Sequence, residues 1–68
     1  MAHGTVKYFN DQKGYGFIVP EGQDESEVYV HFSAIESSGF RTLHEGERVE
    51  FKTMSSTRGT EATHVLKV

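Results

Sequence analysis

Aromatic and small or aliphatic side chains alternate in the stretch "QKGYGFIVP" (12–20): Tyr15 and Phe17 lie two residues apart, with Gly16 between them and Ile18 after them. Residues at i and i+2 share one face of a β-strand. Pro20 cannot donate to a strand ladder, so it marks the end of the run. The stretch therefore predicts a strand over 15–20 that has one aromatic face and one small or aliphatic face.

The rest of the chain predicts four more strands and very little helix. In "RVEFKT" (48–53), Val49, Phe51 and Thr53 alternate with charged residues, a period of two that indicates one buried and one solvated face. The acidic segment 21–27 and the segment 55–60 are predicted as loops, and 33–40 has room for one short helical turn with Ser33 as a possible cap. This pattern predicts a small all-β barrel. Its strands are expected at 4–10, 15–20, 28–32, 48–53 and 61–68, the last with an ambiguous register.

The aliphatic residues are sufficient to fill a small barrel. In "VYVHF" (28–32), Val28 and Val30 oppose Tyr29 and His31. Burying the aliphatic side leaves the rings outside. The opposite assignment, an aromatic core, stays open on the pattern alone, although it would place valines and isoleucines in water. The predicted interior consists of Val6, Ile18, Val28, Val30, Ile35, Val49, Phe51 and Val65.

An exposed patch of rings follows from this assignment, and on a monomeric protein such a patch usually marks an interaction site. Phe9 is expected to point away from the patch as partial core. The outward side chains are Tyr15, Phe17, Tyr29 and His31, with Tyr8 expected beside them.

Length and charge restrict the function classes. The 68 residues predict a single domain, 1–68, and seven Lys and Arg against ten Asp and Glu give a formal net charge of −3. A protein that binds nucleic acid mainly by neutralising phosphates should be basic. The sequence has no cysteine, which fits a reducing cytoplasm, and neither a signal peptide nor a membrane span is predicted.

Two motifs nevertheless point to nucleic acid. "KGYGFIV" (13–19) follows the RNP1 pattern of RNA-binding modules, and "VYVHF" (28–32) resembles RNP2. Flat side chains on a rigid sheet can stack unpaired bases at about 1–3 kcal/mol per base. In an RNA recognition motif RNP2 comes first and helices separate the strands, whereas here the RNP1-like strand comes first and no helix fits between.

That order resembles the bacterial cold-shock proteins, and the resemblance covers essentially the whole chain through "GTVKYFN", "KGYGFI", "VYVHFSAI" and "GFRTLHEGERVEF". It implies a single cold-shock domain with a five-stranded antiparallel OB-type β-barrel. The implied function is an RNA chaperone that melts or prevents mRNA secondary structure and so affects transcription and translation, often at low temperature. The implied partners are single-stranded RNA and single-stranded DNA, pyrimidine-rich strands in particular, bound by a cytoplasmic monomer without cofactor, metal or membrane contact.

The resemblance also implies which residues bind. Lys7, Lys13 and Arg58 would meet the backbone or base edges, and Tyr15 would lie at the edge of the platform. The stacking residues would be Tyr8, Phe17, Tyr29, His31, Phe32 and Phe40.

Three departures from the family pattern argue for somewhat weaker binding. Tyr8 stands where the family usually has Trp, and Thr60 stands where it commonly has Pro. The acidic loop 21–27 is also slightly long, which places negative charge near the predicted binding face.

Two other function classes remain open. A nuclease or other RNA-processing enzyme would need a carboxylate cluster with metal or a histidine pair. No nucleophile or orienting partner for His31 stands at a spacing in the sequence that would indicate catalysis. The histidines are scattered without metal-ligand spacing, so neither catalytic nor metal-binding residues are predicted. The second class is an OB-type protein-interaction module, in which the exposed rings would contact a partner protein.

Overall fold

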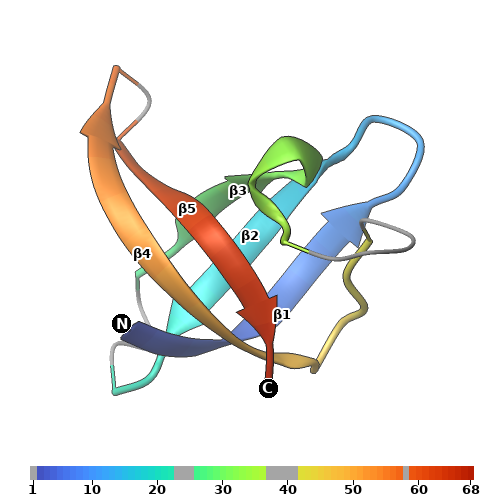
Figure 1. Ribbon diagram of the computed structural model, residues 1–68, viewed down its shortest axis with the longest axis horizontal. Helices are drawn as coiled ribbons and strands as arrows, with labels where there is room; N and C mark the ends of the chain where they lie inside the picture. The colour runs from blue at the N-terminus through green and yellow to red at the C-terminus, as the bar shows by residue number, and fades with distance from the viewer. Residues whose placement is uncertain (1, 23–25, 37–41, 58) are drawn as a thin grey trace.

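The computed structural model describes residues 2–22, 26–36, 42–57 and 59–68, which form a closed barrel (Figure 1). Around the barrel the strand order is β1-β2-β3-β5-β4, and β4 returns to pair with β1. The five-stranded all-β barrel that the sequence predicted is confirmed. Its elements are β1 (Ala2–Asn10), β2 (Tyr15–Pro20), β3 (Val28–His31), the 3₁₀ helix η1 (Phe32–Ala34), β4 (Arg48–Ser56) and β5 (Gly59–Lys67).

The barrel is antiparallel except where β3 meets β5. That pair is parallel, with Tyr29 opposite Glu61, and a parallel bridge from Ile35 to Val65 continues it beyond the strand. Strand β5 follows β4 in the chain and pairs with β3, which closes the barrel. This closure brings the C-terminal strand next to the RNP2-like strand, although the two are far apart in the sequence.

The interior is the aliphatic side, as predicted. All eight residues expected inside are at most 4% exposed, so the alternative with an aromatic core is wrong. Leu43 and Ala62 complete the core, and Phe9 packs against it as a partly buried side chain. Leu43 was missed because it lies outside any strand, and Ala62 because the register of the last strand was ambiguous.

A β-bulge in β1 determines which of its side chains face outward. Val6 pairs with Ile18 and Tyr8 pairs with Phe17, so Lys7 is the extra residue of β1. Strict alternation would put Val6 and Tyr8 on one face. The extra residue reverses the alternation, and Val6 is 1% exposed whereas Tyr8 is 39% exposed.

A second irregularity explains the register of β5. Glu50 pairs with Leu66 and Lys52 with Thr63, which leaves one more residue on β5 than on β4. His64 adopts a positive φ of 51° at this point. Ala62 and Val65, three residues apart, therefore both face the core.

Two local predictions were wrong. The segment 55–60 is not a loop, because β4 extends to Ser56 and β5 begins at Gly59. Pairing across the hairpin continues to its tip and satisfies backbone groups that a loop would leave to water. Ser33 does not cap the helical turn: it lies within η1, and His31 is the N-cap residue.

Candidate nucleic-acid interface

Four rings from three neighbouring strands form one outer surface, here called the aromatic face: Tyr8 of β1, Tyr15 and Phe17 of β2, and Tyr29 of β3. Strand pairing places Phe17 between Tyr8 and Tyr29. Tyr15 stacks near Tyr29 at a centroid distance of 6.0 Å and meets Tyr8 edge-on at 6.3 Å. The rings support one another while leaving surface exposed, and apart from the stacked Tyr15–Tyr29 pair they meet edge-on, so they form a preorganised set of stacking surfaces.

Two glycines allow neighbouring parts of the chain to lie very close to one another at the aromatic face. A Cβ on Gly16 would lie 2.1 Å from the carbonyl oxygen of Tyr8 and 2.7 Å from the Cα of Phe9, so β1 and β2 could not approach as they do. Gly14 has φ +75°, and a Cβ there would lie 2.7 Å from the Phe32 ring. The glycines of the RNP1-like motif thus serve close backbone and ring approach, as expected of glycine in a strand.

Phe32 and His31 extend the aromatic face beyond the end of β3. Their ring centroids lie 4.6 Å apart at an interplanar angle of 42°, and Phe32 is 43% exposed. The Phe32 backbone N–H donates to the carbonyl of Gly14 at 2.8 Å, which ties η1 to the turn before β2. An exposed large ring held by backbone contacts is suited to contact a ligand.

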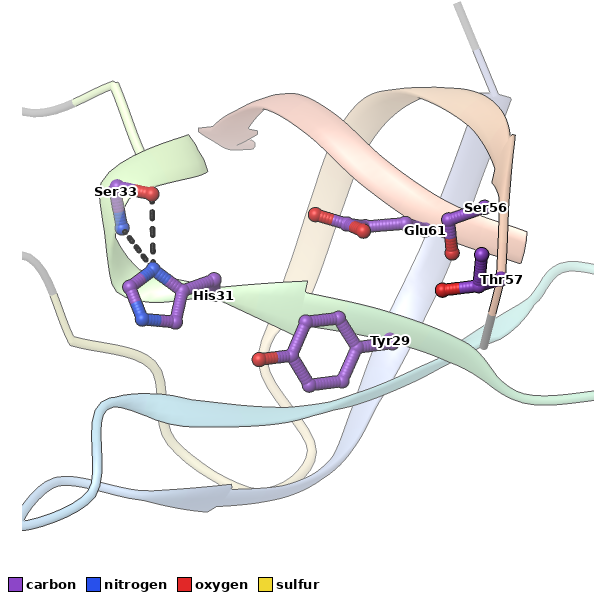
Figure 2. Close-up of a pocket in the computed structure, with 6 residues that line it drawn as sticks. All are labelled: Tyr29, His31, Ser33, Ser56, Thr57 and Glu61. Carbon is purple, nitrogen blue, oxygen red and sulfur yellow. Dashed lines mark hydrogen bonds between the residues drawn. The ribbon is translucent and has the colours of Figure 1, made fainter. Parts of the chain in front are cut away.

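The His31 ring is oriented by Ser33. The Ser33 backbone N–H donates to Nδ1 of His31 at 3.3 Å, and the Ser33 hydroxyl lies 2.9 Å from the same nitrogen (Figure 2). Because Nδ1 accepts the backbone hydrogen bond, the neutral ring carries its proton on Nε2. His31 therefore presents a donor to the surface.

Asn10 organises the turn that carries Lys13. Its side-chain oxygen accepts the backbone N–H groups of Gln12 and Lys13, each at 3.0 Å, and its amide nitrogen lies 3.3 Å from the Tyr8 hydroxyl. This Asx-type turn is one reason Asn is favoured in such positions. One residue thereby positions both a predicted stacking ring and a predicted cation.

The charged residues around the face are only partly available. The Lys7 ammonium forms an ion pair with Glu27 of the acidic loop. Lys13 is exposed and has no acidic partner among the described residues. The predicted contacts Phe40 and Arg58 lie outside the described residues.

A hollow of about 290 Å³ adjoins Tyr29, between the end of β3 and the tip of the β4–β5 hairpin. Figure 2 shows its lining: Tyr29, His31, Ser33, Ser56, Thr57 and Glu61. No local pattern pointed to the residues from the hairpin, because barrel closure alone brings them to β3. The hollow adds polar groups at the border of the aromatic face.

Metal sites and membrane-spanning helices are absent from residues 2–22, 26–36, 42–57 and 59–68. Among these residues, no group of three or more His, Cys, Asp or Glu is placed to hold a metal ion. No helix within the same ranges is long and apolar enough to cross a membrane.

Comparison with known proteins identifies the fold and the family. The family model described as "'Cold-shock' DNA-binding domain" matches residues 2–68. The chain belongs to this cold-shock domain family. It is 53% identical over 68 residues to the major cold shock protein of Micrococcus luteus, with all of both chains covered, and 50% identical over the same length to cold shock protein CspA of Staphylococcus aureus, again with full coverage.

The barrel itself also resembles a more distant cold-shock structure. The solved structure "drosophila Unr CSD456" superposes with a TM-score of 0.77 over 98% of this chain and 26% of that one, at 18% identity. At that identity the likeness supports the fold alone. The predicted family membership and fold are confirmed, and cold-shock domains are nucleic-acid-binding domains, so the aromatic face is the natural candidate for the interface.

Proposed function

We propose that this cold-shock domain binds single-stranded nucleic acid by stacking unpaired bases on the aromatic face and the adjoining rings of His31 and Phe32. The observation that carries the proposal is the packing of Tyr8, Phe17 and Tyr29 on adjacent strands with their rings outside the core. Bases in single strands expose their π-faces, and aromatic side chains on a sheet receive them with little dependence on sequence.

Magnitudes explain how an acidic chain can bind a polyanion. Five or six stacked bases at about 1–3 kcal/mol each give a large favourable binding free energy, from which the entropic cost of ordering the strand must be subtracted. Three phosphate contacts, from Lys7, Lys13 and Arg58, would give a logarithmic salt slope of only about −2. The ion pair of Lys7 with Glu27 lowers even this contribution. Stacking therefore supplies most of the affinity.

The same mechanism leads to an RNA chaperone that needs no chemistry and is not an enzyme. A ligand that binds only the open strand shifts a hairpin toward its open form by mass action. Duplexes are poor ligands because their bases are already stacked and their faces hidden. In the cytoplasm, a monomer of this kind would keep mRNA unstructured, with pyrimidine-rich stretches preferred, and so affect transcription and translation.

Intrinsic tyrosine fluorescence tests the proposal directly, because the sequence has three tyrosines and no tryptophan and all three tyrosines belong to the aromatic face. We would titrate the protein with a short pyrimidine-rich single strand and then with the matching duplex, each at low and at moderate salt. Quenching by the single strand, little quenching by the duplex and a shallow salt slope are expected.

The alternative, a protein-interaction module, predicts the opposite pattern. No quenching by any oligonucleotide at any salt would reject base stacking on these rings. A concentration-dependent increase in molecular size in that case would point to a protein partner.

A further inference from the structure

The side-chain amide of Asn10 has a fixed orientation. Its oxygen accepts the backbone N–H groups of Gln12 and Lys13, each at 3.0 Å. The amide nitrogen is therefore the atom that faces Tyr8, and it lies 3.3 Å from the hydroxyl oxygen of that ring. An amide NH₂ group only donates hydrogen bonds. The Tyr8 hydroxyl is thus the acceptor in this pair.

This pairing leaves the proton of the Tyr8 hydroxyl unused. A phenolic hydroxyl accepts hydrogen bonds and has one proton to donate. Among the described residues, no acceptor takes that proton. Tyr8 is 39% exposed, and Tyr15 meets its ring edge-on at a centroid distance of 6.3 Å, which restricts how the Tyr8 ring can turn. The aromatic face therefore carries an oriented hydrogen-bond donor at the rim of one of its rings.

The position of this donor decides which part of a bound strand it can contact. The hydroxyl lies in the plane of the Tyr8 ring, whereas a base that stacks on the ring lies above that plane. The donor is therefore directed beside the stacked base, where the sugar–phosphate backbone continues, and phosphate oxygens accept hydrogen bonds from tyrosine hydroxyls. Asn10 also fixes the backbone of Lys13, whose ammonium attracts phosphate from the same side of the platform.

We propose that the Tyr8 hydroxyl, oriented by Asn10, donates a hydrogen bond to a phosphate oxygen of the strand whose base stacks on the Tyr8 ring. This inference rests on the proposed function, because the base must first stack on Tyr8. It gives Tyr8 a second role beside stacking and makes Asn10 a positioning residue that acts through the Tyr8 hydroxyl. Because the donor is neutral, it lets an acidic chain hold a phosphate without a further cation.

Tyr8→Phe tests the donor, because it keeps the ring and removes only the hydroxyl. Labelled DNA heptamers of thymidine, cytidine and adenosine would be titrated by fluorescence anisotropy at several salt concentrations; DNA is chosen because it has no 2′-hydroxyl. The variant should bind all three strands about threefold to tenfold more weakly, the order of one hydrogen bond. The salt slope should not change, because a neutral hydroxyl releases no counterion. Tryptophan has a ring N–H donor of its own, so Tyr8→Trp is not equivalent to this change.

Asn10→Asp tests the orientation of the donor. Aspartate keeps an oxygen for the two backbone N–H groups and is also favoured in turns of this kind. Its second oxygen replaces the amide nitrogen and only accepts, so it captures the proton of the Tyr8 hydroxyl. The matched control is the same change in Tyr8→Phe protein, which has the added negative charge but no proton to capture. Asn10→Asp should cost about threefold to tenfold more affinity in the wild-type background than in this control.

The outcomes separate this inference from the proposed function, once circular dichroism has established that each variant is folded. If Tyr8→Phe binds all three strands as tightly as the wild-type protein, the hydroxyl contact is rejected while single-strand binding stands. A loss that depends on the base would reject the phosphate as the acceptor, and an equal cost of Asn10→Asp in both backgrounds would reject the role of Asn10. If the wild-type protein binds none of the strands, the proposed function is rejected and this inference with it.

Discussion

Replacing Phe17 with alanine removes the ring at the centre of the aromatic face. Strand pairing places Phe17 between Tyr8 and Tyr29, and its ring centroid lies 6.1 Å from that of Tyr29. Loss of one stacking platform costs about 1–3 kcal/mol, which weakens binding about 5- to 150-fold. The ring is not part of the buried core, so the variant should lose less stability than the roughly 3–5 kcal/mol typical of truncating a buried Phe such as Phe51.

Lys13→Ala provides the electrostatic comparison, because Lys13 is exposed and outside the ring cluster. Removing one phosphate contact should flatten the logarithmic salt slope by about 0.7. If the electrostatic contribution is taken as zero at 1 M salt, this change in slope makes binding about twofold weaker at about 0.3 M salt. That loss is smaller than the loss of at least about fivefold expected for Phe17→Ala.

The assay is a titration of a labelled pyrimidine-rich heptamer at several salt concentrations, with circular dichroism to establish that both variants are folded. Phe17→Ala should lower affinity at every salt concentration without changing the slope. If Lys13→Ala instead weakens binding more than Phe17→Ala does at about 0.3 M salt, base stacking is not the main source of affinity.

Three further changes test other parts of the structure. Glu27→Gln releases the Lys7 ammonium from its ion pair, so the salt slope should steepen by up to about 0.7; an unchanged slope would show that Lys7 does not contact the strand. Gly16→Ala would place a Cβ 2.1 Å from a backbone oxygen of β1, and thermal unfolding should show a loss of about 3 kcal/mol or more. Gly22→Ala is its control, since Gly22 has open space around it and only its positive φ of 79° opposes a side chain, so the change should cost only about 1–2 kcal/mol; equal losses would refute the steric account. Tyr8→Trp enlarges one stacking surface and should strengthen single-strand binding severalfold, and weaker binding in the same titration would contradict a stacking role at this position.

The strands and core could be predicted well where local alternation was regular. In β3 the sequence alternates with a period of two, Val28 and Val30 with Tyr29 and His31, and the structure buries the two valines. At Gly16 the structure brings β1 and β2 closer than a residue with a side chain would allow. These features depend on neighbours a few residues away in the chain, which is the range that sequence patterns report.

Other features of the site come from contacts that no local pattern encodes. Tyr8 reaches the aromatic face only because the bulge at Lys7 reverses the alternation after Val6. A bulge depends on how two strands pair, so the sequence of β1 alone could not indicate it. The ion pair of Lys7 with Glu27 likewise joins residues that approach one another only when the barrel has formed.

Local sequence patterns predicted the all-β fold, its aliphatic interior and an exposed set of rings, because the alternation of side chains along each strand depends only on neighbouring residues. The closure of the barrel by β5 against β3, which brings Glu61 beside Tyr29, follows from the folded structure alone. A barrel closes only when its strands pair along their hydrogen-bonding edges and each buries one face in the interior. Both conditions involve strands that are far apart in the sequence, so no single segment encodes them.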